Sequence, residues 1–395
     1  MRERVLTLPA RFRAEASEGF AGEFALTVDG EPFAIAIADG GCSVREVEPK
    51  SPTSRITTDA DTWLALDAGQ VSSIDAFLDD RIVVRGNVEQ AVRMQSLFEP
   101  SARPRTPQDL DHVTVRAGGH ELSVFAFGEG PPVVLLHGLA ATKLSFMPLL
   151  PPLADRYRVV VPDLPGHGDS DKRRARYTPS YYADVVVEIL DALGLDRATL
   201  VGNSMGGRVA LEVAAEAPER VTSLVLLAPA VAGLPWPFYA RFVRALPPGI
   251  GRVPLPLQRR VVMRAIRQLF ARPDRLAAAG YLAGVDEFIR VYRSGRARIG
   301  LLSAIRGLAG DAPTEFWDRM REVEAPALIL WGLEDRLVPE RLGRKLAATL
   351  RRAELVVLPE VGHVPQFEVP EITRELVLEF LESLGDGPRR LPAPA

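Results

Sequence analysis

The stretch Leu200-Val-Gly-Asn-Ser-Met-Gly-Gly207 joins a buried strand to a helix through a very short turn. Residues 198–201 form a short apolar and β-branched run, which predicts a buried parallel strand. Residues 208–216 space their apolar side chains by three and four positions, which predicts a helix. Between them stands the pattern G-x-S-x-G with Ser204 at its centre. Its small residues let the turn close and leave the serine hydroxyl clear of the sheet.

Ser204 is therefore a candidate nucleophile. A helix that begins directly after the serine points its free N–H groups and the positive end of its dipole at the serine hydroxyl. That arrangement suits a nucleophile whose attack produces an oxyanion. The alternative interpretation is an ordinary serine in a glycine-rich turn, so the context of the motif has to separate the two.

The composition is that of an ordinary globular protein. The chain has 395 residues, 47% of them hydrophobic and 25% charged, which predicts two domains or one domain with a large insertion. No apolar run approaches the roughly 20 residues of a membrane span, and the first residues lack the apolar stretch of a secretory signal. Cys42 is the only cysteine, which excludes an internal disulfide and a cysteine-based metal site. We expect a cytoplasmic protein without a metal, a cofactor or a nucleic-acid partner.

Residues 1–105 predict a separate, smaller α+β domain. Alternating runs at 23–28 and 33–37 flank an Asp-Gly turn and predict a hairpin, preceded by a helix over 9–17. Further strands are expected at 43–47, 54–58 and 82–86, and helices at 60–66, 73–78 and 88–98. The proline-rich segment 100–107 predicts an extended linker, after which the second domain begins at residue 106.

The first domain resembles the sterol carrier protein type 2 family over residues 5–100. The likeness is carried by LPARF at 8–12, DADTWLALDAGQVSSIDAF at 59–77 and RIVVRGNVEQAVRMQSLF at 81–98. It departs from the family at 79–81 and at Asn87, where the family commonly has Asp. The resemblance implies an apolar tunnel that holds an acyl chain or a sterol-like ligand. A filled core that serves only packing is the alternative, and the residues concerned are Trp63, Phe77, Leu97 and Phe98.

Residues 106–395 predict a doubly wound, mostly parallel sheet. Strand-like runs at 132–136, 157–162, 198–201, 221–227, 326–331 and 353–358 alternate with helical segments such as 179–193 and 339–350. An antiparallel hairpin at 113–127 is expected at the edge. Ligands bind at the carboxyl ends of the strands in such sheets, and every candidate catalytic residue of this chain follows a strand.

This second part resembles the α/β-hydrolase family over residues 110–385. The motifs that carry the likeness are His137-Gly138, Asp163-Leu-Pro-Gly-His-Gly168, Gly202-Asn-Ser-Met-Gly-Gly207, Gly332-Leu-Glu-Asp335 and Gly362-His363. The resemblance and the placement after strands agree on a triad of Ser204, Asp335 and His363, in the chain order of this fold. It implies that Ser204 is the nucleophile, that His363 is the general base and then the acid, and that Asp335 holds the imidazole tautomer.

Other residues near these motifs are alternatives for the same roles. Glu334 competes with Asp335, but the carboxylate three residues after Gly332 matches the family. His137 and His167 match family positions that stabilise loops. The expected oxyanion donors are the backbone N–H groups of Leu139 and Met205. A serine at the apex of the turn argues against the dehalogenase and epoxide hydrolase branches, which use aspartate there.

Between residues 229 and 322 the alternation of strands and helices stops, and this insert resembles the helical cap of the family. Residues 236–239 and the apolar face of Val262, Ile266 and Leu269 are candidates for an acyl pocket or for packing of the cap. The insert carries 16 basic and seven acidic side chains, whereas residues 1–105 carry 12 basic and 17 acidic ones. The basic excess, which includes arginines 259, 260, 264 and 267, indicates a solvated face, peripheral contact with an anionic membrane, or an acidic substrate.

Together these observations predict a serine hydrolase that cleaves carboxylic esters of lipid-like or other apolar acyl substrates. The segments 202–207, 331–339 and 362–368 also resemble the carbon–carbon bond hydrolases of ring-fission products, which is one alternative. The Leu-Ala-Ala-Thr run at 139–142 and Val364 depart from that branch. A lipid-binding carrier with a vestigial hydrolase is the other alternative, and the complete triad opposes it.

Overall fold

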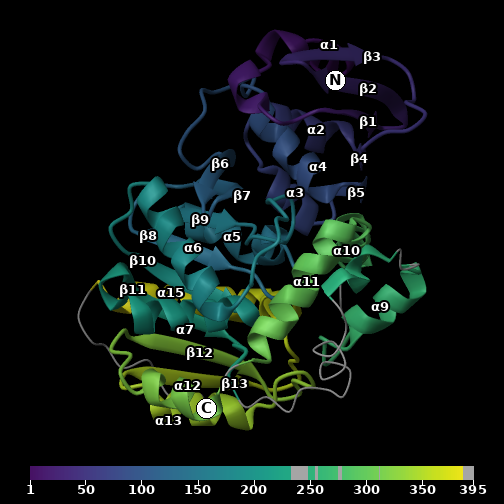
Figure 1. Cartoon of the computed structure of the whole chain (residues 1–395). Coiled ribbons are helices and arrows are strands. Elements are labelled where there is room, and N and C mark those ends of the chain that lie inside the picture. Colours follow the sequence, from purple (N-terminus) through teal and green to yellow (C-terminus); the bar gives the residue numbers. More distant parts are fainter. Residues whose placement is uncertain (233–247, 254–256, 275–277, 311, 386–395) are drawn as a thin grey trace.

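The computed structural model describes residues 1–232, 248–253, 257–274, 278–310 and 312–385. Figure 1 shows a small sheet with its helices, in purple and blue, at one end of a larger sheet that is flanked by helices. The first of these units is the α+β domain expected in front of the motif, and the second contains every motif of the predicted hydrolase.

The front domain is a five-stranded sheet in the order β3-β2-β1-β4-β5. Its strands are β1 (Gly22–Val28), β2 (Glu31–Ala38), β3 (Gly41–Arg45), β4 (Ser54–Thr58) and β5 (Ile82–Gly86). Its helices are α1 (Arg2–Leu6), α2 (Ala60–Asp67), α3 (Ser73–Leu78) and α4 (Val88–Met94). Asn87 begins α4 because its side-chain Oδ1 accepts a hydrogen bond from the N–H of Gln90 at 3.1 Å. The departure from the family at this position therefore preserves a helix cap.

The helix predicted over 9–17 is wrong. The chain forms two short 3₁₀ turns there, Leu8–Arg11 and Ala14–Ser17, with Phe12 extended between them. Phe12 forms an isolated β-bridge with Phe98, and the two rings pack with their centroids 5.7 Å apart. Tertiary pairing with the end of the domain thus outweighs the local helix propensity.

The large sheet has eight strands in the order β13-β12-β11-β10-β8-β9-β7-β6. They are β6 (Asp111–Ala117), β7 (His120–Phe127), β8 (Pro132–Leu136), β9 (Arg158–Pro162), β10 (Ala198–Asn203), β11 (Val221–Leu227), β12 (Ala327–Gly332) and β13 (Ala353–Leu358). The six strands from β8 to β13 are parallel, and β6 and β7 form the antiparallel edge hairpin. This confirms the doubly wound, mostly parallel sheet. The motif strand β10 lies between β8 and β11, and all of its residues are buried.

Alternate residues of these strands point to two different apolar clusters. Leu200 faces the cluster that contains α6 (Pro179–Ala192), α7 (Met205–Glu216), α12 (Pro313–Met320) and α13 (Arg341–Thr349). Val201 faces the cluster that contains α5 (Leu150–Ala154), the 3₁₀ helix Lys143–Leu149 and α15 (Pro370–Ser383). This second cluster continues into the front domain, where it includes Ile74 and Phe77 of α3. The two domains therefore share one apolar core.

The segment 100–107, predicted as a linker, contains no helix or strand and is held at both ends. Arg103 donates hydrogen bonds to the carbonyl oxygen of Gly69 at 2.8 Å and to both carboxylate oxygens of Asp109 at 2.7 and 2.5 Å. The N–H of Ser101 donates to the carbonyl oxygen of Asp67 at 2.7 Å. The connection between the domains is therefore anchored to both of them.

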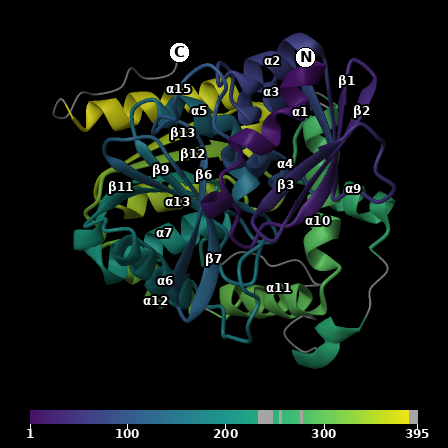
Figure 2. The same cartoon turned by 90° about the horizontal axis from the view of Figure 1, so that it is seen from above.

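The described part of the cap is helical, as predicted. Within 229–322 it contains the 3₁₀ helix Pro248–Arg252, α9 (Arg259–Arg267), α10 (Ala278–Tyr292) and α11 (Gly295–Leu308), followed by α12, which contacts α7 and α13. In Figures 1 and 2, α10 lies beside the front domain, and it contacts β5. Residues 236–239, a candidate for the acyl pocket, lie outside the described residues. Among the described helices, none combines the length and the apolarity that a bilayer crossing needs.

Candidate active site

Ser204 sits alone in the turn between β10 and α7. β10 ends at Asn203, α7 begins at Met205, and Ser204 has φ +52° and ψ −114°. A positive φ at a residue with a side chain is strained, and such strain persists only where surrounding contacts impose it. Here the N–H of Ser204 donates to the carbonyl oxygen of Leu227 at 3.0 Å, and its carbonyl oxygen accepts from the N–H of Ala230 at 2.9 Å. The turn is therefore fixed from the neighbouring strand β11.

The two glycines of the motif are required by the close approach of backbone to backbone. A Cβ on Gly206 would lie 1.8 Å from the carbonyl oxygen of Leu136, at the end of β8. A Cβ on Gly202 would lie 2.4 Å from the carbonyl carbon and oxygen of Gly206 and from the N of Gly207. No side chain fits at either position. The two glycines of G-x-S-x-G are thus required because the turn leaves no room for a side chain at either position.

His363 and Asp335 form the second half of the predicted triad. The Nδ1–H of His363 donates to Oδ2 of Asp335 at 2.7 Å, and both side chains are buried. The other oxygen of Asp335 accepts from the N–H groups of Leu337 and Val338 at 2.8 and 2.9 Å. Asp335 is thereby locked in place, and it fixes the tautomer that leaves Nε2 of His363 without a proton. That Nε2 is buried and has no hydrogen-bond partner among the residues that the structure describes.

Glu334, the competing carboxylate, has a different role. Its Oε2 accepts a hydrogen bond from the backbone N–H of Val361 at 3.1 Å, two residues before His363. It therefore supports the loop that carries the imidazole, whereas Asp335 binds the imidazole itself.

Asn203, whose function the sequence analysis missed, joins the two halves. Its Nδ2 donates to the carbonyl oxygen of Leu227 at 2.9 Å and to the carbonyl oxygen of His363 at 3.2 Å. The residue directly before the candidate nucleophile therefore holds the backbone of the candidate base. Its position inside the motif was the available signal, but nothing local indicates a partner so distant in the sequence.

The loop that carries Leu139 passes close to Ser204. A Cβ built on Gly138 would lie 3.4 Å from the Cβ of Ser204. The loop is attached at its start because Nε2 of His137 accepts from the N–H of Leu164 at 2.9 Å. It turns at Ala140, which has φ +63°. Met205, the other predicted donor, is the first residue of α7, where helical N–H groups are unpaired.

His137 and His167 lie beside this loop rather than at the nucleophile. Their ring centroids are 5.1 Å apart, and both side chains are fully buried. Burial lowers the pKa of His167 to about 3, so this imidazole is neutral at ordinary pH. The Nδ1–H of His137 donates to the carbonyl oxygen of Gly138 at 2.8 Å. The geometry agrees with the turn-stabilising role expected for these residues.

The cap reaches the candidate base directly. The carbonyl oxygen of Leu269, just after α9, accepts from the N–H of His363 at 2.7 Å. Glu368 ties the same two segments together, since its carboxylate accepts from the N–H of Ala271 and of Gly362, each at 2.7 Å. Leu269 thus contacts the site through its backbone, and residues 269–271 cover the loop of His363.

Comparison with known proteins agrees with this architecture. A sequence model of the alpha/beta hydrolase fold matches residues 131–370, which is more than half of the chain. The chain belongs to the alpha/beta hydrolase fold family. A model of the SCP-2 sterol transfer family matches residues 5–99. Both resemblances stated from the sequence are thereby confirmed.

Individual relatives of this alpha/beta hydrolase carry different activities. The dihydrolipoyllysine-residue acetyltransferase component of the acetoin cleaving system of Pseudomonas putida is 33% identical over 313 residues, covering 76% of this chain and 79% of that protein. The 2-hydroxy-6-oxo-6-phenylhexa-2,4-dienoate hydrolase of Burkholderia cepacia is 32% identical over 270 residues, covering 64% and 88%. The crystal structure of a membrane phospholipase A superposes with a TM-score of 0.59 and 28% identity, covering 70% and 87%.

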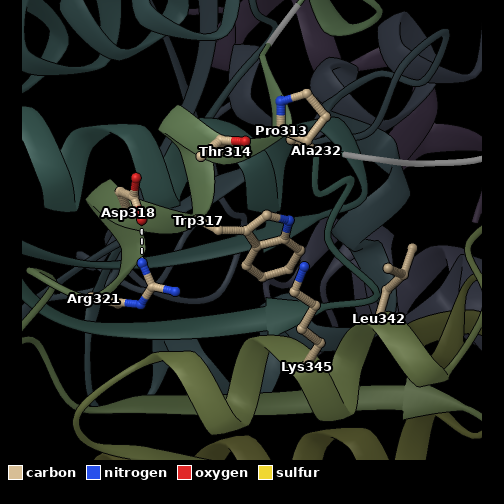
Figure 3. Close-up of a pocket in the computed structure, with 8 residues that line it drawn as sticks. All are labelled: Ala232, Pro313, Thr314, Trp317, Asp318, Arg321, Leu342 and Lys345. Atoms are coloured by element: carbon tan, nitrogen blue, oxygen red, sulfur yellow. Dashed lines mark hydrogen bonds and ion pairs between the residues drawn. The ribbon is translucent and has the colours of Figure 1, made fainter.

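A hollow of about 350 Å³ lies between α12 and α13, and none of the predicted triad residues lines it (Figure 3). The Nζ of Lys345 lies 4.0 Å from the ring centroid of Trp317, and Asp318 pairs with Arg321. The remaining residues that line it are Ala232, Pro313, Thr314 and Leu342. Its charged groups are thus engaged with one another or with the tryptophan ring, and it contains no triad residue.

Gly206→Ala tests the steric requirement of the turn. We predict a loss of about 3 kcal/mol or more of stability, or failure to fold, because the added Cβ meets backbone that cannot yield. Gly284→Ala in α10 is the control, since a Cβ there meets no described atom within 4 Å, and it should stabilise the protein by about 0.5–1 kcal/mol. Urea denaturation of both variants measures the difference. Equal stability of the two variants would contradict the account of the turn.

Proposed function

We propose that this hydrolase is a serine esterase for carboxylic esters with apolar acyl groups. The observation that carries the proposal is the orientation of His363, whose Nδ1–H is bound to Asp335 while its Nε2 has no partner. Its backbone is held by Asn203, next to Ser204. A base in this tautomer, with its backbone held by the residue before a serine on a strained turn, supports activation of that hydroxyl for attack on an acyl group.

In the proposed reaction the Oγ of Ser204 attacks the ester carbonyl carbon, and its proton passes to Nε2 of His363. The N–H groups of Leu139 and Met205 donate to the resulting oxyanion, and such a donor contributes about 3–4 kcal/mol. The bond to the alkoxide then breaks, and His363 returns the proton to the leaving oxygen. Water repeats the sequence on the acyl-enzyme and releases the acid. Asp335 stabilises the imidazolium through its hydrogen bond to Nδ1–H.

An apolar acyl group is favoured by the side chains beside the loop. Val291, Tyr292 and Ala297, from the ends of α10 and α11, form an apolar cluster with Ala140 of the oxyanion loop. Phe288 and Leu301 pack against the same cluster. The structural likeness to a membrane phospholipase A and the SCP-2 family match of the front domain support the same substrate class.

The carbon–carbon bond hydrolase remains the second candidate. It is favoured by the relative from Burkholderia cepacia, a 2-hydroxy-6-oxo-6-phenylhexa-2,4-dienoate hydrolase. The same serine, histidine and aspartate would serve, so the triad does not separate the two reactions. The two reactions can be separated by measuring kcat/KM for p-nitrophenyl esters and for that dienoate on the same preparation. We expect a higher kcat/KM for the esters.

Substitution of the triad tests the proposed roles. Ser204→Ala and Asp335→Asn should each lower kcat for p-nitrophenyl butyrate by about 10⁴-fold or more, because the nucleophile or the tautomer is lost. Glu334→Gln is the matched control. It keeps an oxygen that can accept from Val361 and should retain near wild-type kcat. A large loss in Glu334→Gln with activity retained in Asp335→Asn would overturn the assignment.

For the front domain we propose a lipid ligand that satisfies Trp63. The Nε1–H of this buried indole finds no hydrogen-bond acceptor within the described part of the chain, although a buried donor without an acceptor is costly. Phe77, Leu97 and Phe98 are buried in the same apolar cluster, and a carboxylate or hydroxyl oxygen of a ligand would supply the missing acceptor. The full chain should therefore bind a fluorescent fatty acid, with about tenfold weaker affinity in Trp63→Phe. Absence of both binding and co-purified lipid would indicate a filled core.

The second hollow of the described structure supports the predicted contact with an anionic membrane. It measures about 970 Å³ and is lined by Asp171, Lys172, Arg173, Arg174, Arg252, Ser294, Gly295, Arg296 and Ile299. Arg173 pairs with Asp171, whereas no ion pair of Arg174, Arg252 or Arg296 is found within the described residues. We propose that these three guanidinium groups contact lipid phosphates, since each basic residue near such a surface contributes about 1 kcal/mol.

Vesicle flotation tests this contact. The protein should float with phosphatidylglycerol vesicles and not with phosphatidylcholine vesicles, and the triple variant Arg174→Gln, Arg252→Gln, Arg296→Gln should lose most of the binding. The control is Arg2→Gln, Arg45→Gln, Arg55→Gln, which removes the same charge from front-domain arginines that pair with glutamates. Equal flotation of the two triple variants would refute a specific surface.

A further inference from the structure

A buried lysine fixes the far end of the loop that carries Leu139. The backbone N–H of Lys143 donates to Oδ1 of Asp163 at 2.7 Å, and its Nζ donates to Oδ2 of the same carboxylate at 2.6 Å. The Nζ also donates to Oγ of Ser123 at 2.9 Å. Both charged side chains are completely buried. Since His137 is held by Leu164, the loop 137–143 is attached at both ends to residues 163–164.

The front domain supplies the second carboxylate to this lysine. Oε1 of Glu89, in the first turn of α4, lies 2.8 Å from Nζ of Lys143, and only 4% of the glutamate side chain is exposed. Oγ of Ser123 donates to the same oxygen at 3.3 Å. The other oxygen of Glu89 lies 3.7 Å from Nη2 of Arg290, on the cap helix α10. Every ion pair and hydrogen bond found for the Glu89 side chain within the described residues therefore leads out of the front domain.

We propose that Glu89 is a positioning residue for the oxyanion loop, so that the front domain forms part of the hydrolase site. The inference rests on the proposed function, because it concerns the loop that would stabilise the oxyanion. A carboxylate that the front domain needed for its own stability would have partners within that domain. Asp67 is such a case, since its partners are Arg11 and Arg4.

The physical reason lies in the cost of burying the ammonium group. Burial lowers the pKa of Lys143, and the neighbouring carboxylate of Asp163 opposes that shift. If Glu89 lost its charge, Asp163 would be the one ion-pair partner left to the buried ammonium group among the described residues. Asp163 also accepts from the N–H groups of Lys143 and Asp169, so a shift of this carboxylate moves the end of the loop. The N–H of Leu139 would then leave its position at the oxyanion.

Such a change weakens an interaction made only in the transition state, so it lowers kcat and leaves KM nearly constant. Full-length Glu89→Gln should lower kcat for p-nitrophenyl butyrate by about 10–100-fold, with KM changed less than about twofold, because one oxyanion donor is displaced rather than removed. A fluorophosphonate probe should still label Ser204 completely in this variant, but more slowly, since the nucleophile is intact.

Asp67→Asn is the matched control, because it removes a buried, paired carboxylate from the same domain without touching Lys143. It should lower the melting temperature and leave kcat of the folded protein unchanged. If Glu89→Gln has wild-type kcat, or if Asp67→Asn lowers kcat equally, the inference is overturned. If Glu89→Gln does not fold, Glu89→Asp is used instead, because it keeps the charge at a greater distance from Lys143. It should show a smaller loss of kcat at constant KM. Wild-type kcat in Glu89→Asp would also overturn the inference.

The same measurements separate this inference from the proposed function. A wild-type protein that neither hydrolyses the ester nor reacts with the probe at Ser204 would overturn both. If the wild-type protein hydrolyses the ester and reacts with the probe at Ser204, and Glu89→Gln behaves identically, only the role of Glu89 is overturned.

Discussion

The strained turn at Ser204 is the constraint on which the rest of the site depends. β10 lies in the middle of the sheet and passes to α7 through one residue with a positive φ. That turn is possible only because Gly206 lies against the end of β8, where no Cβ fits. Asn203, the residue before Ser204, binds the backbone of His363. Packing of one turn therefore places the candidate nucleophile, the backbone of the candidate base and the start of the loop that carries Leu139.

A second constraint comes from charge. Lys143 and Asp163 are completely buried beneath the loop, and their environment includes residues from the front domain and the cap. Arg290 of the cap pairs with Asp169 at 2.7 Å and with Glu287 at 2.6 Å, and it approaches Glu89. Three segments far apart in the sequence thus meet at one charged cluster. The front domain accordingly shares both an apolar core and a charged cluster with the hydrolase domain. Cutting the chain at residue 106 would expose the shared apolar core and would remove Glu89 from the charged cluster.

Much of this architecture was predictable from local patterns. The inner parallel strands of the large sheet, such as β8, β10 and β12, are mostly apolar runs, and the G-x-S-x-G turn is required by sterics, so both can be recognised in the sequence. Asp335 could be preferred to Glu334 only through the family pattern, and the structure adds the reason, which is the bond of Glu334 to Val361. Asn203, Glu89 and the bridge between Phe12 and Phe98 could not be foreseen. Each depends on a partner in another element, and no periodicity or spacing in the chain encodes such a pairing.

The central claim is that Ser204 carries the acyl group during the reaction. The most direct measurement is mass spectrometry of the protein quenched in acid within milliseconds of mixing with p-nitrophenyl butyrate. The account predicts a mass increase of one butyryl group, located on the peptide that contains Ser204, together with a burst of nitrophenol that matches the enzyme concentration. Steady hydrolysis with no adduct and no burst, and unchanged in Ser204→Ala, would contradict it.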